Sequence, residues 1–265
     1  MSERPEGVCA VLDATLAHHL PWRVGGRCDA LITVHSRDAL GPAQAWCRDR
    51  GWQRTLIGSG SRTLVRDGGL AGAVMRLGAG FSFVHPTERG VRVGAATPLA
   101  VLPTLAGAPA AWQGLRFAPG SVGASIALDP GWEGWVRAVS VVLRGKERWE
   151  DFAAVRARGE GVWVVEVELA FAPEGEGRAP GPVGASSWYQ PPKNDEVTAL
   201  IRQAALADTR LRQVAIPESA PELLVNLGGG TARDLSMLHK SAIERVHREI
   251  GVQLEDRMNW IGRVS

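Results

Sequence analysis

The sequence is poor in lysine, and arginine carries almost all of its positive charge. Of its 30 basic residues only three are lysines, at positions 146, 193 and 240. Guanidinium groups suit bidentate contact with carboxylates and phosphates, although a bias in genomic codon use explains the same excess more simply. The net charge of +2 is too small, and the arginines too scattered, for a nucleic-acid or membrane-surface partner. A small-molecule partner is the better expectation.

Cysteine is also scarce, and no long apolar run occurs. Cys9, Cys28 and Cys47 are odd in number and lack the CxxC or histidine pairing of a zinc site, so reduced thiols are predicted. The first residues, MSERPEGVCAVLDATL, lack a basic stretch followed by an apolar run. No apolar segment approaches the roughly 18 residues of a membrane span. We expect a cytoplasmic protein, monomeric and without a membrane segment.

The six histidines share no spacing that would hold a metal ion. Two of them, His239 and His247, are predicted on the exposed side of the last helix. No metal site is predicted.

Hydrophobic periodicity divides the chain into strands and helices. A strand at 30–34, a helix at 38–50 and a strand at 55–57 form a β-α-β unit, followed from residue 73 by short strands and a short helix at 98–105. Further strands are predicted at 138–143 and 162–171, and the Pro- and Gly-rich residues 172–183 read as a linker or surface loop.

The last part of the chain is predicted to hold two helices. The first covers 195–205; the second begins at a capping box of Thr231 and Asp234 and ends at Gly251, before a strand VQLED. The fold class is therefore α+β.

The stretch LIGSGSRTLVRDGG, residues 56–69, follows the strand at 55–57. Gly58 and Gly60 let the backbone come close to a ligand, and the hydroxyls of Ser61 and Thr63 could help to hold a pyrophosphate. The third glycine of the dinucleotide fingerprint is absent, so a hairpin turn explains the stretch about as well. Its aspartate, at position 67, is predicted to accept hydrogen bonds from the two glycine amides that follow it.

A second glycine run, RFAPGSVGASIA, covers residues 116–127. Gly120 lies in a turn, and the small residues after it could begin a helix whose N-terminus faces an anion. A plain loop between a helix and a strand is the alternative. Two such runs in one half of a chain favour a dinucleotide ligand.

Five motifs together resemble the UDP-N-acetylenolpyruvoylglucosamine reductases, the MurB flavoenzymes of peptidoglycan synthesis. The first glycine run is similar to the family's GxGSNLLxxD, and the second, within GLRFAPGSVGASIA, to GLxxLxGIPGTVGGA. WRVGG near the start is similar to TFRVGG, VNLGGGTARDL to VNxGxATAxDV, and GVQLEDRMNWIG to GVxLEPEVxxIG. The motifs follow one another in the family's order and cover most of the chain, which most resembles the family's compact subgroup.

The resemblance implies a two-lobed FAD-binding domain of the vanillyl-alcohol-oxidase (PCMH) type, with lobes at 1–75 and 76–172 and a small α+β substrate domain at 173–265. It implies that the two glycine runs hold the FAD pyrophosphate. The residues it assigns to the cofactor are Gly58, Ser59, Gly60, Ser61, Arg62, Thr63, Gly120, Ser121, Val122, Gly123 and Ala124.

The resemblance also implies the reaction. NADPH reduces the flavin, and the enolpyruvyl ether of UDP-N-acetylglucosamine then takes the hydride at C3 and a proton at C2, giving UDP-N-acetylmuramate for peptidoglycan precursors. An acid and support for the developing enolate are needed. By position in the motifs, Ser186 corresponds to the proton donor, Arg156 to the carboxylate-binding arginine and Glu255 to the first glutamate of LEPEV. A turn serine and a solvated surface arginine are the alternatives for the first two.

Tyr189, Gln190, Asn226 and Arg257 correspond to substrate-binding positions, although a buried Asn226 satisfying its own loop is an equal alternative. Some departures weaken the expected activity. Arg257 replaces the family's catalytic glutamate, Tyr189 a lysine, Arg62 an asparagine and Ala124 a glycine. The charge reversal beside the reacting carbon would impair proton delivery. Glu255 or Asp256 could substitute for the missing glutamate after a local shift. A silent relative that binds a nucleotide or nucleotide-sugar, or a flavin oxidase acting on another substrate, is the alternative function.

Overall fold

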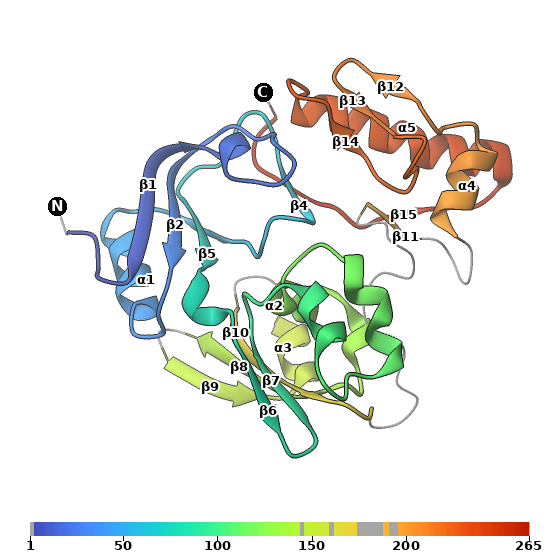
Figure 1. Cartoon of the computed structure of the whole chain (residues 1–265). Helices are drawn as coiled ribbons and strands as arrows, with labels where there is room; N and C mark the ends of the chain where they lie inside the picture. Colours follow the sequence, from blue (N-terminus) through green and yellow to red (C-terminus); the bar gives the residue numbers. More distant parts are fainter. Residues whose placement is uncertain (1–2, 144–145, 159–161, 174–187, 191–195, 265) are drawn as a thin grey trace. The chain divides into compact units, whose positions relative to one another are not determined.

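The computed structural model describes residues 3–143, 146–158, 162–173, 188–190 and 196–264 (Figure 1). The chain forms two compact units. The first unit comprises Met1–Ala14, Cys28–Ser59 and Ala71–Gly181, and the second comprises Thr15–Arg27, Gly60–Leu70 and Pro182–Ser265. Most of the predicted linker, residues 174–183, lies outside the described residues. The three-domain division at residues 75 and 172 stays a prediction.

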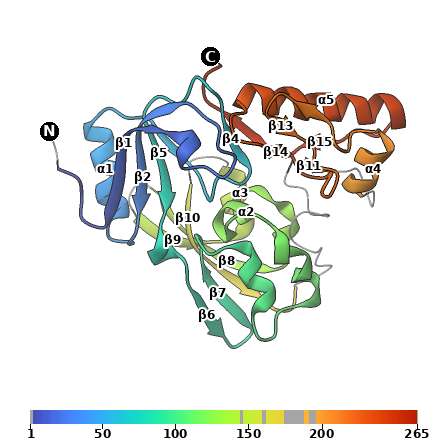
Figure 2. The same cartoon turned by 45° about the horizontal axis from the view of Figure 1, so that its top comes forward.

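The first sheet of the first unit has the strand order β1-β2-β5-β3 and packs against one helix (Figures 1 and 2). Strands β2, β5 and β3 run parallel, as a β-α-β connection requires. Val34, Ala43 and Met75, from β2, α1 and β5, are fully buried in the core between them. The elements are β1 (Val8–Thr15), β2 (Arg27–Val34), α1 (Leu40–Asp49), β3 (Arg54–Leu56) and β5 (Ala73–Leu77).

The second sheet of the first unit is antiparallel, in the order β6-β7-β10-β8-β9. In its central strand Val165, Val167 and Leu169 are completely buried, and Val164, Glu166 and Ala170 on the other face are buried as well. The strands are β6 (Val84–Thr87), β7 (Gly90–Gly94), β8 (Val136–Leu143), β9 (Lys146–Glu150) and β10 (Trp163–Ala170).

Short helices complete the first unit, and a core rich in tryptophan lies among them. Trp112, Trp132 and Trp135 are buried there, and the Trp132 indole donates to Ser125 Oγ at 2.8 Å, which secures α2. The α-helices are α2 (Val122–Leu128) and α3 (Phe152–Arg158), and the 3-10 helices are η2 (Ala79–Phe81), η3 (Leu99–Thr104), η4 (Ala110–Phe117) and η5 (Pro130–Trp132).

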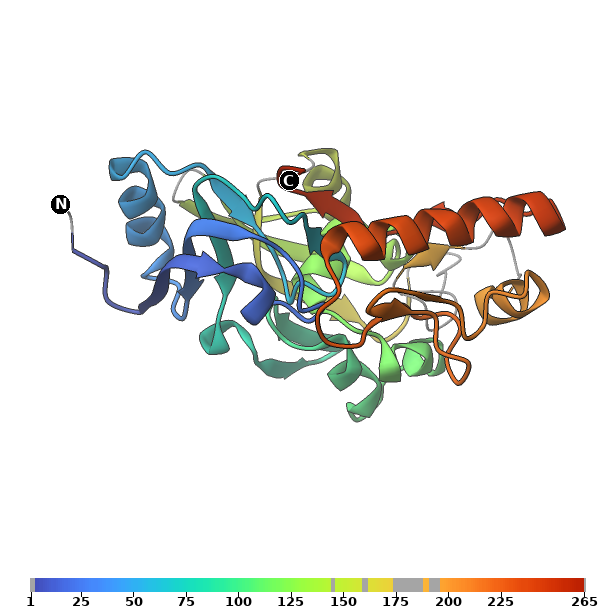
Figure 3. The same ribbon diagram turned by 90° about the horizontal axis from the view of Figure 1, so that it is seen from above.

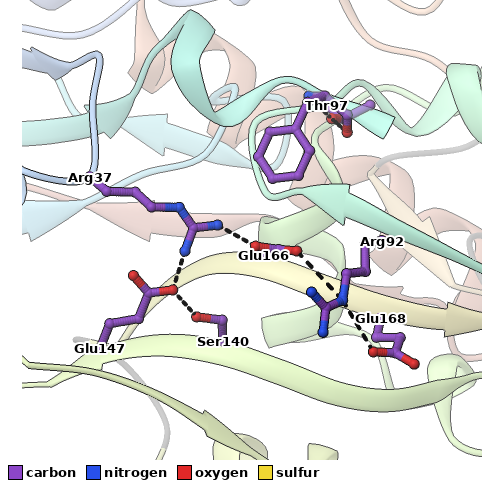
Figure 4. A network of polar contacts seen from close by, with 8 residues as sticks. Arg37, Arg92, Thr97, Ser140, Glu147, Glu166 and Glu168 are labelled. Carbon is purple, nitrogen blue, oxygen red and sulfur yellow. Dashed lines mark hydrogen bonds and ion pairs between the residues drawn. The ribbon is translucent and has the colours of Figure 1, made fainter. Parts of the chain in front are cut away.

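An ion-pair network joins the two sheets of the first unit (Figure 4). Arg37, in the connection from β2 to α1, donates to Glu147 of β9 and to the buried Glu166 of β10. Arg92 of β7 lies 3.3 Å from Glu168 of β10. The paired arginines offset the cost of placing Glu166 in a buried strand.

The second unit is built around one long helix, α5 (Ala232–Ile250), the red helix in Figure 3. Its apolar face packs on α4 and on small sheets, with Leu235, Ala242 and Val246 completely buried. The sheets have the orders β16-β4, β11-β15 and β12-β13-β14. The remaining elements are η1 (Leu16–His18), β4 (Thr63–Val65), β11 (Tyr189–Gln190), α4 (Val197–Gln203), β12 (Arg210–Leu211), β13 (Val214–Ala215), β14 (Val225–Asn226), β15 (Glu255–Asp256) and β16 (Asn259–Ile261).

The predicted α+β class is confirmed. The capping box at Thr231 and the left-handed Gly251 that ends α5 are both present. The predicted strand VQLED is reduced to Glu255–Asp256. Cys9, Cys28 and Cys47 carry free thiols, as predicted. In the described part of the chain, no helix has both the length and the apolar character needed to cross a membrane.

Candidate functional site

The first glycine run does not form a hairpin, because the strands on either side of it belong to different sheets. β3 pairs with β5, whereas β4 pairs in parallel with β16. Gly60 has φ +81°, a conformation that favours glycine. The run also crosses from one unit to the other between Ser59 and Gly60. The loop therefore changes direction at a position where only glycine is unstrained.

The second glycine run turns at Gly120 (φ +123°) and leads into helix α2, as predicted. The amide of Val122 donates to Thr97 O and the amide of Gly123 to Ala95 O, both at 2.9 Å. A Cβ on Gly123 would lie 2.6 Å from that of Ala95. These two amides already have protein acceptors, so neither is available to a phosphate.

The two glycine runs meet inside the first unit. A Cβ on Gly58 would lie 2.6 Å from the Cβ of Ala124 and 2.9 Å from Ser121 Oγ. The methyl group of Ala124 thus lies against the bare backbone of Gly58. The contact brings together two stretches that the sequence separates by more than sixty residues.

The part of the first run that follows Gly60 is bound to the C-terminal tail within the second unit. Asn259 N donates to Arg62 O at 2.7 Å, and Arg66 N donates to Ile261 O at 2.9 Å. Asp67 does not bond its own glycines, contrary to the prediction. It accepts from the amides of Ala232 (2.9 Å) and Arg233 (3.0 Å), where the unpaired N–H groups of α5 and the helix dipole favour a carboxylate.

Arg156 lies on α3, with its guanidinium 5.7 Å from the ring centre of Phe152. Its Nη1 is buried and has no hydrogen-bond partner among the residues that the structure describes. A buried guanidinium nitrogen without an acceptor is costly, and an anionic ligand would remove the cost. The Arg156 side chain is partly buried, which differs from the alternative of a fully solvated surface arginine.

The predicted substrate and proton-transfer residues of the tail lie on the strand pair β11–β15. Gln190 faces Glu255 in the register, and Tyr189 faces Asp256. The amide of Arg257 donates to Trp188 O at 3.0 Å. The predicted proton donor, Ser186, falls outside the described residues.

Asn226 uses its side chain to hold two loops of the second unit. Its Nδ2 lies 3.2–3.3 Å from the carbonyl oxygens of Trp22, Arg23 and Gly230, and its Oδ1 accepts from the amides of Gly228 and Gly230 at 3.0 Å. The structure therefore supports the alternative reading of Asn226 as a residue that satisfies loop backbone.

Three comparisons with known proteins agree. The family model for the C-terminal domain of UDP-N-acetylenolpyruvoylglucosamine reductase matches residues 180–261. A curated relative from Symbiobacterium thermophilum, UDP-N-acetylenolpyruvoylglucosamine reductase 2, is 31% identical over 272 residues, which cover 91% of this chain and 88% of the relative. The chain belongs to this reductase family. The family reductase of Rubrobacter xylanophilus is 28% identical, with 96% of this chain and 95% of the relative covered.

The crystal structure of the reductase family member MurB from Thermus caldophilus has the same fold. It matches with a TM-score of 0.68 at 23% identity, and the match covers 95% of this chain and 98% of that one. The resemblance that five motifs indicated is thereby confirmed.

The structure gives a context for one departure from the reductase motifs, Tyr189, and for one possible substitute for the family's glutamate, Asp256. Tyr189, at the family's lysine position, is 1% exposed and stacks on His239 with ring centres 4.8 Å apart. Burial, reinforced by the charge of Asp256, raises the pKa of the Tyr189 hydroxyl. Asp256 was a possible substitute for the family's glutamate, but its carboxylate accepts from Met258 N and Trp260 Nε1, both at 2.8 Å.

The prediction that His239 is exposed is wrong, because its side chain is completely buried. The spacing could have revealed this: position 239 follows Leu235 by four residues and precedes Ala242 by three, which places it on the apolar face of α5. His247 lies on the exposed side, as predicted.

Proposed function

We propose that this protein is an FAD-dependent UDP-N-acetylmuramate dehydrogenase, which uses NADPH to reduce UDP-N-acetylglucosamine enolpyruvate for peptidoglycan precursor synthesis. Family membership supports the reaction class. The single observation on the molecule that carries the proposal is the buried Nη1 of Arg156, which has no hydrogen-bond partner among the described residues. The family's reaction needs a cation for the substrate carboxylate.

The residues present fit a flavin nucleotide in their chemistry. Gly58 and Ala124 mark a close approach of two backbone segments that a larger side chain at position 58 would block. The hydroxyl groups of Ser59, Ser61 and Thr63 and the guanidinium of Arg62 are donors of the kind that a pyrophosphate needs. Ser121 borders the same contact, and Gly120 precedes it in the turn. The cofactor roles of these residues remain our proposal.

When bound, FAD would accept a hydride from NADPH and pass it to C3 of the enolpyruvyl group. Arg156 would hold the substrate carboxylate and stabilise the negative charge that develops as C3 accepts the hydride. Ser186 would deliver the proton to C2, with Glu255 as its carboxylate partner. Arg257 and Gln190 would contact the substrate, and Asn226 would act through the loops that it holds.

The catalytic output of this chain is proposed to be weaker than the family's. At the acid position the family has a carboxylate, and this chain has the cation Arg257. Asp256 cannot take over, since its two oxygens are engaged and its pKa is lowered. Burial opposes ionisation of Asp256, but the hydrogen bonds and charge of His239, the amide of Met258 and the Trp260 indole outweigh it. Glu255, exposed on the same strand, is the remaining carboxylate.

Flavin loading tests the proposal first. The purified protein should bind FAD in a titration followed by quenching of flavin fluorescence, and anaerobic NADPH should bleach the visible band of the bound flavin. If the protein could not be loaded with FAD, the alternative of a catalytically silent relative that binds a nucleotide or nucleotide-sugar would hold instead. A protein that is reduced by NADPH but not reoxidised by the enolpyruvyl sugar nucleotide would be a flavin oxidase with another substrate.

A further inference from the structure

A polar pair lies inside an aromatic cluster of the second unit. His239 of α5 is completely buried, and its Nε2 lies 2.9 Å from Asp256 Oδ1. The imidazole stacks on Tyr189 at an interplanar angle of 19° and has the rings of Trp188 and Trp260 at 5.4 and 5.7 Å. Nε2 is thus the ring nitrogen that lies within ion-pair distance of the carboxylate.

Asp256 has three polar partners in the unit. Besides its ion pair with His239, it accepts hydrogen bonds from Met258 N in its own turn and from the Trp260 indole in β16, each at 2.8 Å. Charge-assisted hydrogen bonds of this kind fix direction as well as distance. The carboxylate is therefore held on the side of β15 that faces α5.

The position of Asp256 determines where its neighbours point. Successive side chains of a strand project to opposite faces, so Glu255 projects away from the face that holds Asp256, and Arg257 follows directly after the strand. The pairing of β15 with β11 sets the backbone register as well. Gln190 lies opposite Glu255, and the Arg257 amide donates to Trp188 O. The tail residues proposed for proton transfer and substrate binding thus depend on a single register.

We propose that His239 and Asp256 are positioning residues, which hold β15 against β11 so that Glu255 and Arg257 present their side chains to the substrate. This inference rests on the proposed function. A slip of one residue would turn Asp256 away and bring a glutamate or an arginine into the aromatic cluster, where it would lack its matching donors. A two-residue strand pair has few backbone bonds of its own, so a specific polar contact is needed to select its register.

The test compares His239→Gln, which keeps an N–H for Asp256, with His239→Leu, which removes it. In His239→Leu we expect FAD affinity and the rate of reduction by NADPH to stay within about twofold. Reoxidation by the enolpyruvyl sugar nucleotide should slow by about 100-fold, as for a misplaced catalytic group. His239→Gln should recover most of this rate, and His247→Leu, on the exposed side of the same helix, should leave it unchanged.

Hydrogen exchange at the Arg257 amide provides a readout that does not need turnover. Protection of this amide should fall in His239→Leu and persist in His239→Gln and His247→Leu. If His239→Leu does not fold, Asp256→Ala removes the same contact from the exposed side and should give the same loss. Unchanged protection, or equal behaviour of the Gln and Leu variants, would overturn the inference. If the wild-type protein showed no turnover, the proposed function would be rejected. The hydrogen-exchange data would still decide whether His239 and Asp256 position β15.

Discussion

The carboxylate of Asp67 caps helix α5, although 165 residues separate it from the Ala232 amide that it accepts from. Asp67 ends the first glycine run, and α5 is the main helix of the second unit. Thr231 and Asp234 satisfy other N–H groups of the same turn, so this helix start draws on two separate parts of the chain.

Asp67→Ala should lower the free energy of unfolding by about 1–2 kcal/mol, because two amides at the positive end of α5 lose their acceptor. Thermal or urea unfolding would measure it. Asp38→Ala, which removes an exposed carboxylate from the first unit, is the control and should stay within about 0.5 kcal/mol. Equal stability of the two variants would mean that water replaces the Asp67 cap at no cost.

Gly58→Ala should destabilise the protein and weaken FAD binding, because its Cβ would overlap Ala124 and Ser121. Ala124→Gly in the same chain should recover part of both losses, since it removes the methyl group in the way. Gly114→Ala, where a Cβ meets nothing within 4 Å, is the matched control. The interpretation fails if the double variant is no better than Gly58→Ala in FAD titration and thermal unfolding.

Arg156→Met should cost little stability, or raise it, because it removes a buried guanidinium nitrogen that has no partner in the part of the chain that the structure describes. The same change should lower kcat/KM for the enolpyruvyl sugar nucleotide by about 10- to 100-fold, the range for losing a charged hydrogen bond. Melting curves and steady-state kinetics measure the two effects. A large drop in stability with unchanged kinetics would place Arg156 in the framework and not in the site.

These residues show which parts of the structure can be read from the sequence. The ends of α5 were predictable because Thr231, Asp234 and Gly251 act on backbone within a few residues of themselves. The partners of Asp67 and Asp256 were not, since each depends on a segment brought near only by the fold. His239 is an intermediate case. Its helical spacing indicated burial, but its polar side chain led to the prediction that it is exposed. Arg156 was placed by motif order, and its unpartnered nitrogen is visible only in the structure.

Acid pH should reveal the ion pair of Asp256. Its folded-state pKa is lowered, so the stability that it contributes is present above its unfolded pKa of about 3.9 and is lost as the pH falls through the folded value. The difference in unfolding free energy between wild type and Asp256→Asn should therefore be largest near neutral pH and shrink below about pH 4. A difference that does not change between pH 7 and pH 3 would argue against an ionised Asp256.

Arg257→Glu should raise the reductase activity, because it restores the carboxylate that the family has at this position. The FAD affinity and the rate of reduction by NADPH should not change. Arg257→Gln separates gain of a carboxylate from loss of a cation. No gain in a folded, flavin-loaded Arg257→Glu variant would show that Arg257 does not occupy the acid position.

The most direct test of the proposed function is the oxidative half-reaction. Flavin-loaded protein is reduced with one equivalent of NADPH without oxygen and mixed with UDP-N-acetylglucosamine enolpyruvate while the visible flavin band is followed. The account predicts that the band returns and that mass spectrometry finds a nucleotide-sugar product with two added hydrogen atoms. Flavin that stays reduced, with the sugar nucleotide recovered unchanged, would contradict it.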